Sequence, residues 1–200
     1  MIVYVESNFC LELAFQQEEE AQAEEILQLA EGGRLELVFP QFAVSEPFST
    51  LNRYDNERGR FLTDLNKQLS QLNRSVPHQG IVAGTQPLVA TLTRIGQDQT
   101  NRLETVVARM LRSGRTISLT APLFADAQRL EGLYALSPQD AIVGASVLGD
   151  LQAQKADPDS HAFLSRNSKD FNPMKAAFGA VGCRYLSKFR DGLQFIGSKI

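Results

Sequence analysis

The chain has 200 residues, of which 43% are hydrophobic and 22% charged, and its net charge is -3. This length allows one sizeable core but is short for two full domains, and the composition excludes a disordered chain. No stretch approaches the ~20 apolar residues that span a bilayer, and the N-terminus lacks the basic and apolar regions of a secretory signal. We therefore expect a cytoplasmic protein that does not contact a membrane.

The first 40 residues alternate strands with helices. IVYV at the N-terminus is a run of β-branched and aromatic residues, which is typical of a strand buried in a parallel sheet. LELVFP is a second strand, closed by a proline that cannot continue a central ladder. Two amphipathic stretches lie between them, and a glycine pair stops the second. The predicted elements are strands over 2–5 and 35–40 and helices over 9–16 and 19–31.

The middle of the chain is helical in period. Apolar residues recur at steps of three and four residues on both sides of a break at SVPHQG, and Gly114 stops the pattern. We expect a helix over about 41–74 and one or two further helices over about 84–113.

The last third returns to alternation. Strands are predicted over 116–120 and 161–165, helices over 122–133 and 138–152, and a short edge strand over 183–187 with a tail behind it. Strands that alternate with helices imply parallel pairing and right-handed crossovers. The predicted fold class is therefore α/β, a three-layer α/β/α arrangement around a central parallel sheet of four to five strands.

Charge is distributed unevenly along the chain. Residues 1–50 carry a net charge of -9, residues 51–115 carry +5, residues 116–160 carry -4 and residues 161–200 carry +5. Such segregation permits a basic surface for a polyanion on a chain that is acidic overall. Helix faces that differ in sign by chance explain the charges equally well.

Acidic and amide side chains follow three predicted strands and head one helix. Glu6 ends the first strand, Glu46 lies just beyond the second, Asp140 heads the apolar face of its helix, and Asn167 and Asp170 follow the fourth strand. Carboxyl ends of parallel strands share one edge of a sheet, where chemistry gathers. Carboxylates there repel one another unless a hard cation is bound, and oxygen ligands suit Mg²⁺ or Mn²⁺. Taken singly, each acid is explained as well by a surface position or a helix cap.

YVESNF, LVFPQFAVSEPF, LSPQDAIVGASVL and FLSRNSKDF, in this order, resemble the motifs of the PIN-domain family. These metal-dependent ribonucleases include the VapC-type toxins of bacterial toxin–antitoxin pairs. The family's first strand ends in an aspartate and a small hydroxyl residue, matched here by Glu6 and Ser7. Its second and third acids match Glu46 and Asp140, and its fourth falls by spacing on Asn167. The resemblance implies a single PIN-like domain over residues 1–200, with a helical insertion at about 53–115.

The resemblance also implies an activity, namely hydrolysis of RNA phosphodiester bonds by a water molecule activated by Mg²⁺ or Mn²⁺. The metal ligands would be Glu6, Glu46, Asp140 and Asn167, with Asp170 as a further catalytic candidate.

Four side chains are candidates for substrate binding: Ser7, Arg53, Arg166 and Lys169. The implied partners are RNA, an antitoxin protein and a second copy of the chain. A different reading is a catalytically degenerate PIN-like module that binds RNA or protein without cleavage, since Glu6 and Asn167 both depart from aspartate. A phosphatase on another parallel sheet is less favoured, because NFCLEL after the first strand is not a glycine-rich phosphate loop.

Overall fold

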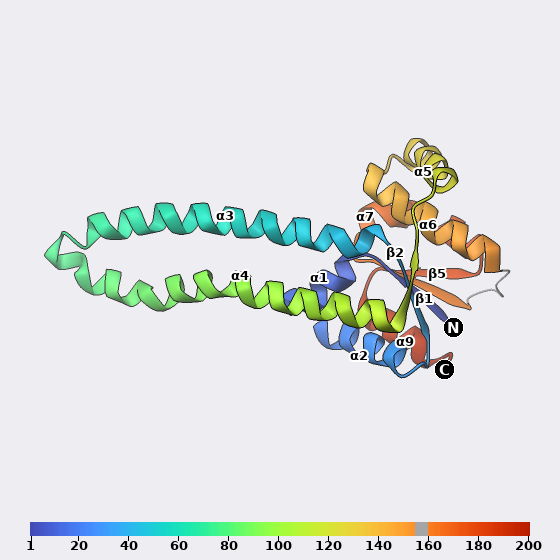
Figure 1. The fold of residues 1–200 in the computed structure, drawn as a ribbon, viewed down its shortest axis with the longest axis horizontal. Coiled ribbons are helices and arrows are strands. Elements are labelled where there is room, and N and C mark those ends of the chain that lie inside the picture. The colour runs from blue at the N-terminus through green and yellow to red at the C-terminus, as the bar shows by residue number, and fades with distance from the viewer. Residues whose placement is uncertain (155–159) are drawn as a thin grey trace.

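The computed structural model describes residues 1–154 and 160–200, and five parallel strands form its sheet in the order β3-β2-β1-β4-β5 (Figure 1). Helices cover both faces of this sheet, which confirms the predicted three-layer α/β/α fold. The strands are β1 (Ile2–Val5), β2 (Glu36–Pro40), β3 (Gly114–Ile117), β4 (His161–Leu164) and β5 (Cys183–Leu186).

Each α-helix of the described chain except three lies close to its predicted place. The helices are α1 (Ser7–Phe15), α2 (Glu20–Glu31), α3 (Phe42–Leu72), α4 (Gln79–Ser113), α5 (Ala121–Tyr134), α6 (Pro138–Gln154), α7 (Ser168–Phe171), α8 (Lys175–Ala180) and α9 (Phe189–Gly197), with short 3₁₀ turns at Val76–His78 and Asn172–Met174. The exceptions are α7 and α8, which continue the turn after β4, and α9. The expected C-terminal tail is wrong, because α9 buries Phe189, Phe195 and Ile196 against the sheet.

The two sides of β1 belong to two cores, as the two-residue period of a strand requires. Val3 and Val5 face α1, α2, α4 and α9, whereas Ile2 and Tyr4 face the layer of α5 to α8. All four residues of β1 are buried. The continuous apolar run at the N-terminus is therefore the signature of a strand covered on both faces.

Helices α3 and α4 form a long antiparallel hairpin that projects away from the sheet (Figure 1). Leu51 and Leu103 mark where it leaves the body, since no residue described between 52 and 102 belongs to either core. Farther out, Arg58 Nη1 contacts Asp55 Oδ1 at 2.6 Å, and Arg58 Nη2 donates to Gln99 Oε1 at 3.0 Å across the two helices. The expected insertion at about 53–115 is thus a hairpin, although its base belongs to the core.

Strand β3 begins two residues before its predicted start. Gly114 pairs with Leu37 of β2, and a Cβ at Gly114 would lie 2.8 Å from the Leu37 carbonyl oxygen. Because glycine has no such atom, α4 passes directly into β3. Among the described residues, no helix is long and apolar enough to cross a membrane.

Candidate functional site

The candidate site lies where the order of strands along the sheet changes direction. The chain builds β1, β2 and β3 outward on one side, then crosses β1 to build β4 and β5 on the other. Val5 and Leu164, the last residues of β1 and β4, are paired. Ligands of open parallel sheets bind outside the carboxyl ends of the strands at such a point. Glu6 and Ser165 directly follow these two strands.

Glu6 is buried, with 5% of its surface exposed. Its Oε2 atom accepts hydrogen bonds from Ser7 Oγ at 2.8 Å and from the Asn8 backbone N–H at 2.9 Å, so Glu6 caps the N-terminus of α1. Its Oε1 atom is buried and has no hydrogen-bond partner among the described residues. A buried carboxylate oxygen without a donor is costly, because it has lost water and gained nothing in return.

The environment of Glu6 favours its neutral form. Burial raises the pKa of its carboxyl group, while the hydrogen bonds from the Asn8 N–H and the Ser7 hydroxyl oppose the rise. The negative charge of Glu46, which is half-buried on α3, raises this pKa further. Glu46 is the smallest of these influences on Glu6, and its sign is that of a like charge after the neighbouring strand.

Asp140 and Asn167 form a second part of the site. Asn167 Nδ2 donates to Asp140 Oδ1 at 2.8 Å, and the Asn167 backbone N–H donates to Ser165 Oγ at 3.0 Å. Ser137 donates its hydroxyl to Asp140 Oδ2 and accepts from the Asp140 backbone N–H, which is a reciprocal cap at the start of α6. The predicted juxtaposition of these two residues is therefore present, and Ser165 fixes the turn after β4 that carries Asn167.

The structure does not draw all the predicted ligands into one cluster. Among the described residues, no group of three or more histidine, cysteine, aspartate or glutamate side chains is placed to hold a metal ion. Asp170 is half-buried in α7, and the structure gives it no hydrogen bond or ion pair with another described residue. The carboxylate and amide oxygens, including the unpaired Glu6 Oε1, are the kind of ligand that a hard cation prefers. The structure groups them as two separate pairs, Glu6 with Glu46 and Asp140 with Asn167.

The predicted cations differ in availability. Arg166 is paired with Glu12, which is fully buried, and with Glu18, so its charge is already balanced within the protein. Lys169 is exposed on α7, and Arg53 lies exposed over the ring of Tyr54 at 5.4 Å on α3. Ser7 contacts Glu6 and is itself buried. Of these four candidates, only Arg53 and Lys169 carry an exposed charge that has no ion pair with an acid among the described residues.

Two residues that shape the candidate site were not predicted from the sequence, namely Glu12 and Ser165. Glu12 stands among apolar residues in CLELAF, and a charge inside such a run is a signal of a buried partner. It accepts from the Glu19 backbone N–H at 2.6 Å as well as from Arg166, so it ties α1 to the turn after β4. Ser165 carries no signal of its own, since its role depends on the pairing of β4 with β1.

A polar hollow of about 480 Å³ opens beside this site. Its lining consists of Asn8, Gln17, Glu18, Arg166 and Asn167. The Asn8 backbone N–H donates to Glu6 and the Asn167 side chain donates to Asp140, so the hollow lies beside the carboxyl ends of β1 and β4.

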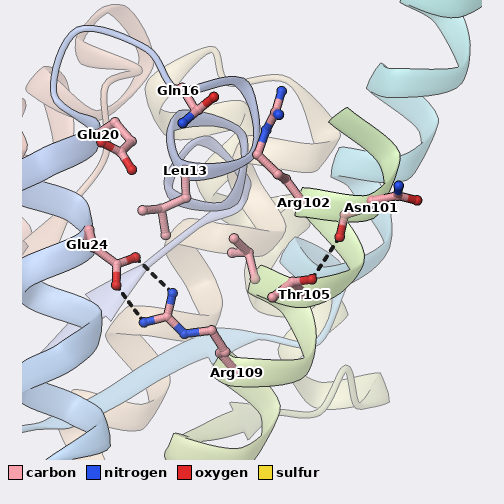
Figure 2. Close-up of a pocket in the computed structure, with 9 residues that line it drawn as sticks. Leu13, Gln16, Glu20, Glu24, Asn101, Arg102, Thr105 and Arg109 are labelled. Atoms are coloured by element: carbon pink, nitrogen blue, oxygen red, sulfur yellow. Dashed lines mark hydrogen bonds and ion pairs between the residues drawn. The ribbon is translucent and has the colours of Figure 1, made fainter. Parts of the chain in front are cut away.

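A second hollow, of about 290 Å³, lies between α1, α2 and α4 (Figure 2). None of the predicted metal ligands lines it. Arg109 of α4 crosses its wall and forms a two-pronged ion pair with Glu24 of α2, at 2.7 and 2.8 Å. Arg109 also pairs with Glu31, and these hydrogen bonds lower the pKa of both glutamates. The hollow thus lies at the contact of α2 with α4, where the charge of Arg109 is balanced by Glu24 and Glu31.

No protein-family model matches the chain, and no similar protein was found among the curated proteins or the solved structures.

Proposed function

We propose that this protein is a divalent-metal-dependent endoribonuclease of the PIN-domain kind, with its active site at the carboxyl ends of β1 and β4. The observation that carries the proposal is the buried Glu6 Oε1, which has no hydrogen-bond partner among the described residues and lies within electrostatic reach of Glu46. A cation between the two carboxylates would relieve both the missing contact and the repulsion.

The residues of the site have separate roles in this proposal. Glu6 and Glu46 would bind Mg²⁺ or Mn²⁺, and Asp140, oriented by Ser137 and Asn167, would complete the ligand set. When bound, the metal supplies a water molecule of lowered pKa for attack on the phosphodiester. Lys169 and Arg53, whose charges are exposed, would hold phosphates of single-stranded RNA on either side of the acids.

Metal binding is the first test. Because a ligand of the folded state alone stabilises it, millimolar Mg²⁺ or Mn²⁺ should add ~2.7 kcal/mol at a hundredfold excess over the Kd, measured as a higher Tm. Glu46→Gln should lose most of this shift, whereas Glu104→Gln, an exposed acid on α4 far along the chain, should keep it. Cleavage of single-stranded RNA should show the same dependence on metal and on Glu46. A Tm that neither metal moves would sink the proposal.

A second candidate function is a PIN-like module that binds without cleaving. The hydrogen bond from Asn167 to Asp140 favours it, because a neutral amide there stabilises the carboxylate without any metal. Asn167→Asp separates the two candidates. If it creates RNA cleavage where the native chain has none, the native site is degenerate; if it abolishes existing cleavage, the native amide is part of a working site.

A further inference from the structure

The outer part of the α3–α4 hairpin exposes large apolar side chains. Phe61 and Leu72 of α3 have exposed fractions of 55% and 42%, and Ile81 and Leu88 of α4 have 64% and 56%. We call these four residues the hairpin face. A monomeric soluble protein leaves single apolar residues exposed, but a contiguous group marks a contact surface.

Helix geometry places the hairpin face on one side of the hairpin. The seam between the two helices is marked by residues that are buried or half-buried, among them Leu62, Val82 and Val89. Phe61, Ile81 and Leu88 directly precede these three residues in turn. Leu72 lies eleven residues, or about three turns, beyond Phe61 and so on the same stripe. Two antiparallel helices are related by a two-fold axis perpendicular to their common plane. Residues that directly precede a seam residue therefore lie on the same side of the hairpin, whether they belong to α3 or to α4.

The α4 half of this surface is also free of charge. From Gln79 to Thr93, fifteen residues of an exposed helix contain no aspartate, glutamate, lysine or arginine. A solvated helix normally carries many such residues, and depletion of charge is the compositional mark of the centre of an interface. An uncharged stripe also brings no like-charge repulsion when it meets an identical stripe.

We propose that the hairpin face binds the hairpin face of a second copy of this chain, so that the two hairpins form a four-helix bundle. The helical residues between 58 and 96 give each hairpin a free length of ~25 Å and a width of ~20 Å. Packing the two faces together then covers on the order of 1,000 Å² in total, which is the lower bound for a specific interface. Because the hairpin projects clear of the sheet, the two bodies do not obstruct this contact (Figure 1).

Leu88 occupies the centre of the interface. The α4 stripe contains Ile81, Leu88 and Ile95 at steps of seven residues, so an antiparallel pairing of two α4 helices sets Leu88 opposite Leu88 of the second copy. Ile81 then meets Ile95 of the second copy at each end. Because of this two-fold symmetry, a single substitution at Leu88 changes both side chains of the central contact.

The oligomeric state tests the proposal directly. Sedimentation of the full chain should give a dimer of twice 22.1 kDa at micromolar concentration. Leu88→Glu and Leu88→Lys should each raise the dimer Kd on the order of 100-fold, because like charges then meet at the two-fold axis. An equimolar mixture of the two variants should restore a dimer. Leu133→Glu, which alters a 71% exposed leucine on α5, should leave the wild-type Kd unchanged.

A covalent test reports the geometry itself. Leu88→Cys should form a disulfide-linked dimer on mild oxidation, whereas Leu133→Cys should not, and the native Cys10 and Cys183 are both buried. A wild-type chain that stays monomeric, or a Leu88→Glu chain that dimerises as tightly as wild type, overturns the proposal. Monomers whose hairpin face is covered by a different protein overturn it equally. None of these outcomes depends on nuclease activity.

Discussion

Glu6 couples the stability of the protein to pH. Its pKa is raised by burial, so the folded state holds a proton on Glu6 at pH values where the unfolded chain, with a pKa of about 4.3, has released it. The stability that this proton confers is complete below the unfolded pKa and is lost as the pH rises through the raised folded value. In metal-free buffer, the free energy of unfolding of the wild type should therefore fall over this range.

Glu6→Gln isolates this effect. Glutamine keeps an acceptor for Ser7 and Asn8 but carries no charge, so the variant should lose less stability than the wild type as the pH rises above the unfolded pKa of about 4.3. Denaturant unfolding at a series of pH values measures the difference. Glu25→Gln on α2, which removes an exposed acid, should follow the wild-type curve. Parallel curves for wild type and Glu6→Gln would show that Glu6 is not the titrating group.

The sequence predicted the positions of those site residues that directly follow a strand, because the strand fixes the sheet edge at which they lie. Glu6 and Glu46 follow neighbouring strands, and Asn167 does meet Asp140. The sequence predicts Arg166 as a phosphate ligand because it flanks the fourth motif, but in the fold Glu12, 154 positions earlier, balances its charge. No local pattern links residues so far apart, since their contact depends on the crossing from β1 to β4. The metal, RNA and catalytic roles remain predictions.

At the scale of elements, Asp150 connects α6 to the sheet. It accepts from the Tyr4 hydroxyl of β1 at 2.7 Å and from both terminal nitrogens of Arg115 of β3 at 2.7 and 2.9 Å. Burial raises the pKa of Asp150, but the hydrogen bonds from Arg115 and Tyr4 outweigh it, so the pKa lies below its ordinary value. One carboxylate thus fixes a helix against two strands that are not neighbours.

Asp150→Asn should destabilise the fold by ~2–3 kcal/mol at pH 7, because it leaves Arg115 partly unpaired and weakens the bond to Tyr4. Asp126→Asn is the matched control, since it breaks an exposed pair with Arg129 and should cost less than ~1 kcal/mol. The lowered pKa stabilises the fold above the unfolded pKa of about 3.9 and is lost as the pH falls through the folded value. The gap between wild type and Asp150→Asn should therefore close in acid, and a gap that persists there would contradict the account.

The period of the apolar residues predicted most helices, because most helices pack one face against the sheet. The missed helix α9 does carry an amphipathic period, with Phe189, Phe195 and Ile196 on its buried side, but it is short and contains Gly192, a residue that disfavours helices. In the fold, a Cβ at this position would lie 2.6 Å from Leu164 Cδ2, so glycine is what allows α9 to approach β4. A close approach between two elements is invisible until both are placed.

At the scale of the whole molecule, the hairpin starts at the same sheet edge as the candidate site. Glu46 lies in the first turns of α3, while Phe61 and Leu88 lie in the halves of α3 and α4 that are nearer the turn between them. The body and the projecting part therefore have separable tasks: the body holds the acids, and the projecting part holds the proposed dimer contact. The sequence indicated this division as an insertion, but it did not show that the base of the hairpin fills the core through Leu51 and Leu103.

Removing the outer hairpin tests this division. Replacing residues 60–94 by a short Gly/Ser linker is geometrically simple, because a Cβ at Gly96 would lie within 2.8 Å of Arg58 Nη1, so the two helices are close at this level. Since no residue described between 52 and 102 belongs to either core, the shortened chain should still unfold cooperatively and should lose less than ~2 kcal/mol of stability. Sedimentation should find it monomeric, and Mg²⁺ or Mn²⁺ should raise its Tm as much as that of the full chain, because Glu6, Glu46 and Asp140 are retained. A shortened chain that folds but no longer responds to metal would mean that the hairpin shapes the site, and one that stays dimeric would place the dimer contact on the body.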